Sequence, residues 1–366
     1  MKILLLEAGG RGGSDFFQAL LDGHTQILSF PGYLRIDKEF KDMLFLKNFK
    51  DIPKKFIKIY PEYFNSKLNK VERHHRLGKN KDKYFTVNRN TFCNSFVEIL
   101  KKKKKKNKIE ILKTLHIAYS ISKKEKQCEK KILFVHTHLY QYTKEFVNLF
   151  EEKNISIIHT IRHPLASLNS PIKRWLTYKN GINFFPKDLH FQLNLVFHGI
   201  NRLMKLKKVF IIQYEMLHWK NIHIMKNFCK TFGLRYEQCL KTPTYFGFKW
   251  WGDEISQRWI SGISKNFKIN IDESFFFKRD LLFFQYLAEN IIKSYKYNFI
   301  YPREKNYFNF LPMKCELLVW KNSFKHMRFK QILSIPFFYF LRVLAINKFW
   351  ISRGKLPISI GLSTKR

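Results

Sequence analysis

Short apolar runs at four places along the chain predict buried strands. Residues 2–6, 132–135, 155–161 and 209–214 are rich in aliphatic, β-branched and aromatic side chains, which is typical of strands covered on both faces. Helical patterns follow the first, third and fourth runs, at 14–21, 164–170 and 219–232. This alternation predicts an α/β fold, in which helices flank a central and mostly parallel sheet.

Two other parts of the chain differ from this pattern. Residues 35–130 are polar and basic, with helical stretches at 91–105 and 110–121, and we expect them to form a helical, basic insertion within an α/β domain of residues 1–300. Residues 301–366 form a basic, aromatic-rich extension with helical character. Its apolar stretch 332–351 fits either a buried helix pair or a helix in a membrane interface. A membrane span is disfavoured because Pro336, Arg342 and Lys348 interrupt the stretch.

The net charge of the 366-residue chain is +40, which raises the question of a polyanionic partner. Lys, Phe, Ile and Asn are all frequent, as in chains encoded by AT-rich DNA, so codon bias explains much of this charge. The lysine run 101–106 fits a solvated helix end. Five scattered cysteines without a CxxC pair argue against a disulfide framework or a structural zinc site. We therefore expect a cytoplasmic protein.

A glycine-rich loop follows the first predicted strand. It places backbone amides at the start of the helix at 14–21, and these amides together with the helix dipole can bind a phosphate or a similar oxyanion. Neither the GK[ST] of a Walker A loop nor the spacing GxGxxG is present. An arginine supplies the fixed cation of the loop. The candidate binding residues are Gly10, Arg11, Gly12, Gly13, Ser14 and Asp15.

A second candidate loop follows the strand at 155–161. Arg162 ends this strand, Pro164 occupies a favoured first-turn helix position, and Ser170 follows two helical turns later. An arginine fork and a hydroxyl on one ligand suit a second phosphate.

In their order and separation, these two loops resemble those of the sulfotransferase superfamily, whose members use 3′-phosphoadenosine-5′-phosphosulfate (PAPS) as the sulfuryl donor. The segment from Arg11 to Asp15 is similar to the family's 5′-phosphosulfate loop, and the segment from Arg162 to Ser170 is similar to its 3′-phosphate loop. The resemblance implies a P-loop-like sulfotransferase fold over roughly residues 1–265.

Two further segments extend the resemblance. His138, in Val135-His136-Thr137-His138-Leu139, matches the family's catalytic base, and Tyr214, before Glu215, matches a tyrosine near the adenine. Asp15 departs from the family pattern, because it places a carboxylate where a hydroxyl is usual. Either it simply favours the first turn of the helix, or it handles protons as a base or as a partner of His138. His136 stands where many relatives have lysine, which makes that charge depend on pH.

The resemblance implies transfer of a sulfuryl group from PAPS to an acceptor hydroxyl, with no metal. We expect a carbohydrate or lipid-linked glycan acceptor and peripheral contact with the inner membrane face through the C-terminal extension. The catalytic candidates are His138, Arg11 and Asp15. The alternative is a non-catalytic polyanion-binding or nucleic-acid-binding protein that retains a sulfotransferase-like fold. A third segment, 246–265, combines aromatic residues, glycines and cations, and could cover a nucleotide, cover the acceptor or simply pack.

Overall fold

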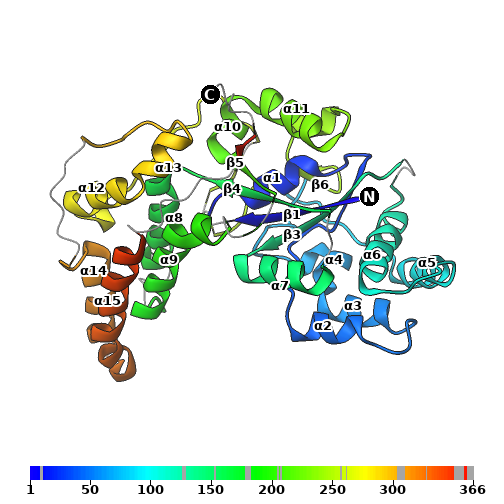
Figure 1. The fold of residues 1–366 in the computed structure, drawn as a ribbon, viewed down its shortest axis with the longest axis horizontal. Coiled ribbons are helices and arrows are strands. Elements are labelled where there is room, and N and C mark those ends of the chain that lie inside the picture. The colour runs from blue at the N-terminus through cyan, green and yellow to red at the C-terminus, as the bar shows by residue number, and fades with distance from the viewer. Residues whose placement is uncertain are drawn as a thin grey trace. The chain divides into compact units, whose positions relative to one another are not determined.

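The computed structural model describes residues 1–8, 11–125, 129–151, 154–177, 183–203, 206, 208–255, 258–260, 262–302, 310–326, 328–349 and 358–360. Its strands form a six-stranded sheet in the order β2-β3-β1-β4-β5-β8. The pairings β1–β3, β2–β3 and β5–β8 are parallel. The prediction of an α/β fold with a mostly parallel sheet and flanking helices is confirmed (Figure 1).

All four predicted strands are present, with small differences at their ends. They are β1 (Lys2–Ala8), β3 (Ile132–His138), β4 (Ile155–Ile161) and β5 (Val209–Gln213). The sequence did not indicate β2 (Ile27–Ser29) or β8 (Ile358–Ser359). Along β1, Ile3 to Leu6 are almost completely buried, which explains why this strand is uniformly apolar.

The chain divides into two compact units. The first comprises residues 1–7, 13–159 and 216–266, and the second comprises 8–12, 160–215 and 267–366. We describe each unit by itself.

The helices of the first unit lie around β1–β4. They are α1 (Ser14–Leu21), α2 (Lys38–Leu44), α3 (Ile52–Ile59), α4 (Pro61–Phe64), α5 (Arg89–Lys101), α6 (Lys108–Ser122), α7 (Tyr140–Phe150) and α11 (Asn221–Phe232). The short helix α10 (Tyr214–Trp219) crosses the boundary between the units. A hairpin of β6 (Thr244–Tyr245) and β7 (Phe248–Lys249) completes this unit.

Region 35–130 has a more apolar interior than its composition indicates. Helices α2 to α6 enclose packed aromatic rings, and Phe30, Phe56 and Tyr63 are mutual neighbours with ring centroids 4.9–6.1 Å apart. Tyr119 of α6 donates a hydrogen bond to the Tyr63 carbonyl at 2.6 Å. The predicted helices at 91–105 and 110–121 correspond to α5 and α6. Helix α5 ends at Lys101, so most of the lysine run lies beyond the helix that was predicted to include it, and the run is largely exposed as predicted.

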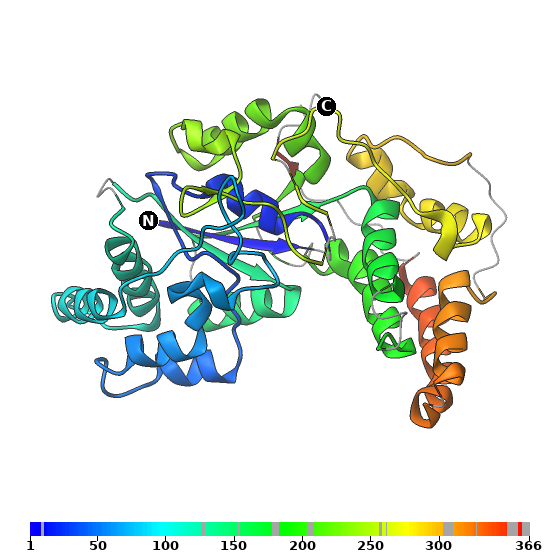
Figure 2. The same cartoon turned by 180° about the vertical axis from the view of Figure 1, so that it is seen from behind.

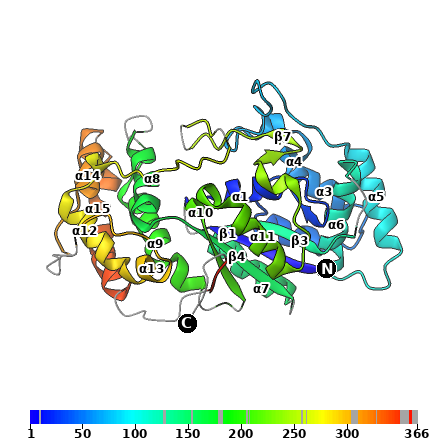
Figure 3. The ribbon, with the colours of Figure 1, turned by 90° about the horizontal axis from the view of Figure 1, so that it is seen from above.

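The second unit contains the remaining helices. They are α8 (Pro164–Thr177), α9 (Pro186–Leu203), α12 (Lys278–Leu287), α13 (Glu289–Ser294), α14 (Lys314–Lys325) and α15 (Phe329–Phe349). Leu168 and Ile172 of α8 share a buried core with Phe284 of α12 and Val319 of α14. Helix α15 packs on α9 and α14, and α14 and α15 lie side by side in Figures 2 and 3.

The four described cysteines, Cys93, Cys229, Cys239 and Cys315, are free. Within the described part of the chain, no helix is both long and apolar enough to cross a membrane.

Candidate functional site

The glycine-rich loop joins β1 to α1, and its backbone conformation requires glycine at two positions. A Cβ on Gly12 would lie 2.2 Å from the carbonyl oxygen of Thr160, so only glycine fits there. Gly13 caps α1 with φ 86°, in the left-handed region that favours glycine. Arg11 adopts φ 55°, an uncommon conformation for a residue with a side chain. Gly10, also predicted as a binding residue, lies outside the described residues.

The first turn of α1 begins directly after this loop. The Phe17 amide donates the first intrahelical hydrogen bond, to the Gly13 carbonyl at 3.0 Å. The amides of Ser14 and Asp15 precede this bond in the chain and belong to the first turn of the helix. Asp15 lies in this first turn, where a carboxylate is favoured by the helix dipole. The local geometry therefore fits both interpretations of Asp15.

The arginine of the first loop contacts the serine of the second. Both residues belong to the second unit, and Arg11 Nε lies 3.4 Å from Ser170 Oγ, although 159 positions separate them in the chain. Ser170 is half-buried on α8, two turns after Pro164 begins the helix. Two segments that were identified independently from the sequence thus meet at one point.

Arg162 lies beside two aromatic rings of the second unit. Its guanidinium carbon is 5.7 Å from the ring centre of Tyr214 and 5.9 Å from that of Phe267. The two rings are perpendicular, with centroids 5.4 Å apart. Cation–π attraction to two aromatic rings holds such a guanidinium in place. Tyr214 was predicted as a site residue, whereas Phe267 had no sequence signal that set it apart from the other phenylalanines.

A buried carboxyl group fixes the loop after Arg162. Glu215 accepts hydrogen bonds from the His163 amide at 2.8 Å and from the Tyr297 hydroxyl at 3.0 Å. Burial raises the pKa of Glu215, and the His163 amide partly opposes that shift. Burial also lowers the pKa of His163 to about 4, so its ring is neutral near pH 7. Glu215 therefore holds the start of the second loop in place through its hydrogen bond with the His163 amide.

A histidine pair and an aspartate gather in the first unit. Asp15 Oδ1 lies 3.9 Å from His136 Nδ1, and the rings of His136 and His138 are 5.4 Å apart. His138 ends β3 with φ 62°, and a register shift in the β1–β3 pairing precedes it. Its Nδ1 is buried and has no hydrogen-bond partner among the described residues. The ring of Tyr33 lies 5.2 Å from that of His138.

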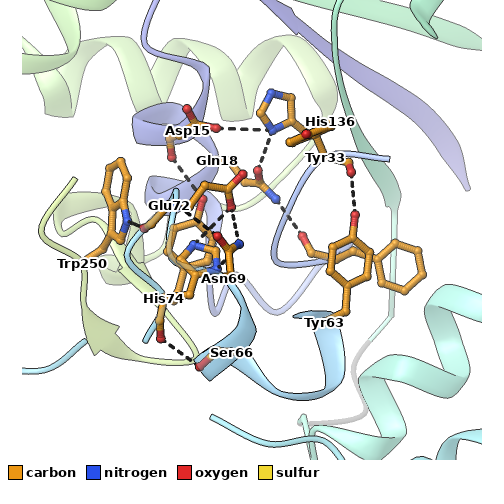
Figure 4. Close-up of polar contacts among 12 residues, drawn as sticks. Asp15, Gln18, Tyr33, Tyr63, Ser66, Asn69, Glu72, His74, His136 and Trp250 are labelled. Carbon is orange, nitrogen blue, oxygen red and sulfur yellow. Dashed lines mark hydrogen bonds and ion pairs between the residues drawn. The ribbon is translucent and has the colours of Figure 1, made fainter. Parts of the chain in front are cut away.

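His136 is held as a neutral ring. Its Nδ1 bonds to Gln18 Oε1 at 2.7 Å, and Gln18 in turn donates its amide to the Phe30 carbonyl at 2.7 Å (Figure 4). Burial, followed by the neighbouring His138, lowers the pKa of His136 well below its ordinary value. His136 thus supplies no positive charge near pH 7, in contrast to the lysine that it replaces in the family pattern.

Asp15, His136 and His138 could together hold a metal ion. One ligand atom from each residue lies within 4.8 Å of the other two. Two imidazoles and one carboxylate suit zinc or iron, with room left for water or a substrate oxygen. The sequence-based expectation of a metal-free site stays a prediction.

Sequence reasoning missed a buried acid beside Asp15. Glu72 is 7% exposed and accepts a hydrogen bond from Asn69 at 3.0 Å, and its carboxylate lies 3.5 Å from His74 Nε2 (Figure 4). Burial, followed by the charge of Asp15, raises the pKa of Glu72 well above its ordinary value. Burial lowers the pKa of His74 to about 3. Burial thus disfavours the charged forms of both side chains.

The segment at 246–265 packs against residues 72–81. Trp250 donates to the Glu72 carbonyl at 2.8 Å, and Trp251 donates to the Gly78 carbonyl at 2.6 Å. The guanidinium of Arg73 donates to the Arg258 carbonyl at 2.6 Å and lies 4.1 Å from the ring centre of Trp259. Of the three predicted roles for this segment, packing is the one that these contacts support directly.

Two solved structures are similar to this chain. The sulfotransferase domain of the Synechococcus PCC 7002 olefin synthase is 12% identical, with a TM-score of 0.42, and the match covers 81% of this chain and 95% of that domain. The sulfotransferase domain of the curacin biosynthetic pathway is 16% identical, with a TM-score of 0.38, and the match covers 88% and 97%. Likeness at this level carries no argument about function. No family model and no curated protein matches the sequence.

Proposed function

We propose that the chain is a PAPS-dependent sulfotransferase that transfers a sulfuryl group to the hydroxyl of a carbohydrate or lipid-linked glycan. The observation that carries the proposal is the 3.4 Å contact between Arg11 and Ser170. Each residue comes from a loop with the sequence pattern of a phosphate site, and a ligand with two phosphate groups needs two such loops to converge. The tightly packed Gly12 and the loop-fixing Glu215 support the same assignment.

The residues that would bind PAPS fall into groups according to the part of the donor that each contacts. Arg11 and the amides of Gly12, Gly13 and Ser14 would hold the 5′-phosphosulfate. Arg162 and Ser170 would hold the 3′-phosphate, which distinguishes PAPS from ATP, and Tyr214 would border the adenine. An arginine fork suits such a dianion better than a lysine because it forms two parallel hydrogen bonds.

The reaction is an in-line displacement at sulfur. The acceptor oxygen forms a bond to sulfur while the bond between sulfur and the 5′-phosphate oxygen breaks, which releases 3′,5′-adenosine bisphosphate. His138 would take the hydroxyl proton, and Asp15 would stabilise the imidazolium that forms. General base catalysis of this kind contributes about 10²–10⁴-fold to the rate. Arg11 would neutralise the charge that develops on the leaving phosphate.

The test is thermal unfolding of the full chain with 3′,5′-adenosine bisphosphate, ATP or 5′-AMP at matched ionic strength. A ligand at a hundredfold excess over its Kd stabilises the folded state by about 2.7 kcal/mol. We expect a shift with the bisphosphate alone, which Ser170→Ala reduces and the exposed-site control Ser274→Ala leaves intact. Equal shifts with all three nucleotides would instead favour a polyanion-binding protein, for which the +40 charge is the supporting observation.

A further inference from the structure

Helix α15 exposes a continuous apolar stripe. Phe329, Leu333, Phe337 and Phe340 are 72%, 65%, 59% and 60% exposed, and Leu344 continues the row at 40%. At about 100° per residue, these five positions fall within about 80° of the helix circumference. They form one narrow face, which we call the α15 stripe.

The opposite face of α15 is firmly packed within the second unit. Both carboxylate oxygens of Glu316 on α14 accept hydrogen bonds from the buried Arg342, at 3.0 and 2.9 Å. The ring of Tyr339 lies 5.8 Å from that of Trp320, and that of Phe338 lies 5.9 Å from that of His190. Because these contacts fix the orientation of α15, the α15 stripe faces outward. Leu317 and Phe324 add exposed apolar surface on the neighbouring α14.

Positive charge predominates on this helix pair. Residues 310–349 contain seven Lys and Arg and a single acid, Glu316, which is buried against Arg342. Lys321, Lys325 and Lys330 are exposed on α14 and at the start of α15. The outer surface of the pair therefore combines large apolar side chains with an excess of positive charge.

We infer that the α15 stripe docks the protein on an anionic lipid surface. A membrane interface offers both an acyl layer for the phenylalanines and phosphates for the lysines, as in other interfacial amphipathic helices. Nucleic acid supplies the phosphates without an apolar layer. A second copy of the chain would place two basic surfaces against each other, which like-charge repulsion opposes. The inference does not depend on sulfuryl transfer.

Co-sedimentation of the full chain with lipid vesicles tests whether the α15 stripe binds an anionic membrane. Neutral vesicles of phosphatidylcholine are compared with anionic vesicles of phosphatidylcholine and phosphatidylglycerol. We expect salt-sensitive binding to the anionic vesicles only. A lysine near an anionic surface contributes about fivefold in affinity, so the triple variant Lys321→Gln, Lys325→Gln, Lys330→Gln should bind roughly a hundredfold more weakly. Replacing Phe337 and Phe340 by Gln should weaken binding about tenfold per residue.

Two control variants distinguish binding through the α15 stripe from nonspecific effects of positive charge or of exposed apolar side chains. The triple variant Lys102→Gln, Lys104→Gln, Lys105→Gln removes the same charge from the exposed lysine run, and Phe45→Gln removes a phenylalanine that is 62% exposed elsewhere. Both should bind like the unmodified chain. Equal losses in the controls, or no binding to anionic vesicles, would overturn the inference. So would concentration-dependent self-association that the Phe337 and Phe340 replacements abolish, since a second copy would then cover the stripe.

Discussion

The substitution Gly12→Ala tests the glycine-rich loop most directly. The added methyl carbon would lie 2.2 Å from the Thr160 carbonyl oxygen and 3.1 Å from its carbon, and neither backbone atom can turn away as a flexible side chain can. Ordinary contact begins near 3.4 Å, so the loop or the end of β4 must move by about 1.2 Å. The neighbouring Arg11 would move with the loop.

The expected cost has two parts. Forcing a methyl group into a filled site costs about 1–3 kcal/mol of folding free energy. A misplacement of about 1 Å at a reacting centre can cost on the order of a hundredfold in rate. We therefore expect Gly12→Ala to lower the melting temperature modestly and to weaken the binding of 3′,5′-adenosine bisphosphate severely.

A matched control comes from Gly233, which ends α11 with φ 72° and has nothing within 4 Å of an added Cβ. Gly233→Ala imposes backbone strain of about 1 kcal/mol without a clash. Calorimetric titration with the bisphosphate, combined with thermal unfolding, compares the two variants. Both should lose stability, and only Gly12→Ala should lose binding. If Gly12→Ala binds the bisphosphate as tightly as the unmodified chain does, the loop does not hold the donor.

Three other predictions concern single residues. Arg162→Ala should weaken the binding of 3′-phosphorylated nucleotides and spare 5′-AMP; an equal loss for both in titrations would contradict its role. His138→Gln should abolish sulfuryl transfer from radiolabelled PAPS and preserve bisphosphate binding, whereas retained turnover would make Asp15 the leading base. Burial lowers the pKa of His116 from 6.5 to about 4. Because that folded-state pKa is depressed, the neutral ring stabilises the fold above pH 6.5, and about 3 kcal/mol is lost as the pH falls toward 4. Denaturant unfolding across this range should therefore show a shallower pH dependence for His116→Gln than for the unmodified chain, and an unchanged slope would refute the assignment.

The strands were the most predictable part of the fold. Strands β1, β4 and β5 are buried, and burial on both faces leaves an uninterrupted apolar run in the sequence. Strand β3 extends three residues beyond its apolar run, to His138. His136 and Thr137 at this end can be buried because Thr137 bonds to the Leu6 carbonyl at 3.1 Å and His136 bonds to Gln18. These hydrogen bonds join residues that are far apart in the sequence, so sequence periodicity does not predict that polar residues are buried here.

The interior of region 35–130 was less predictable for a different reason. The sequence indicated the longer helices α5 and α6, but many aromatic residues of this region lie on the short helices α2, α3 and α4, which bury only a few side chains each. A short helix gives too few turns for a clear apolar period. The rings of Phe56, Phe64 and Phe92 come within 4.9–6.4 Å of one another only when these helices pack together.

The sequence indicated two anion-binding loops, but it predicted neither the contact of Arg11 with Ser170 nor the surroundings of Asp15. A carboxylate in a loop that binds an anionic donor looks unfavourable when the loop is considered alone. Burial disfavours the charged forms of two groups near Asp15. The pKa of Glu72 is raised by burial and by Asp15 itself, and the pKa of His136 is lowered by burial. Protonation of Glu72 removes its charge repulsion of Asp15, and Asp15 lies within reach of the half-buried His138. If His138 acts as the base, as we propose, Asp15 lies where it can stabilise the protonated ring, and its place in the first turn of α1 fits a purely helical role equally well.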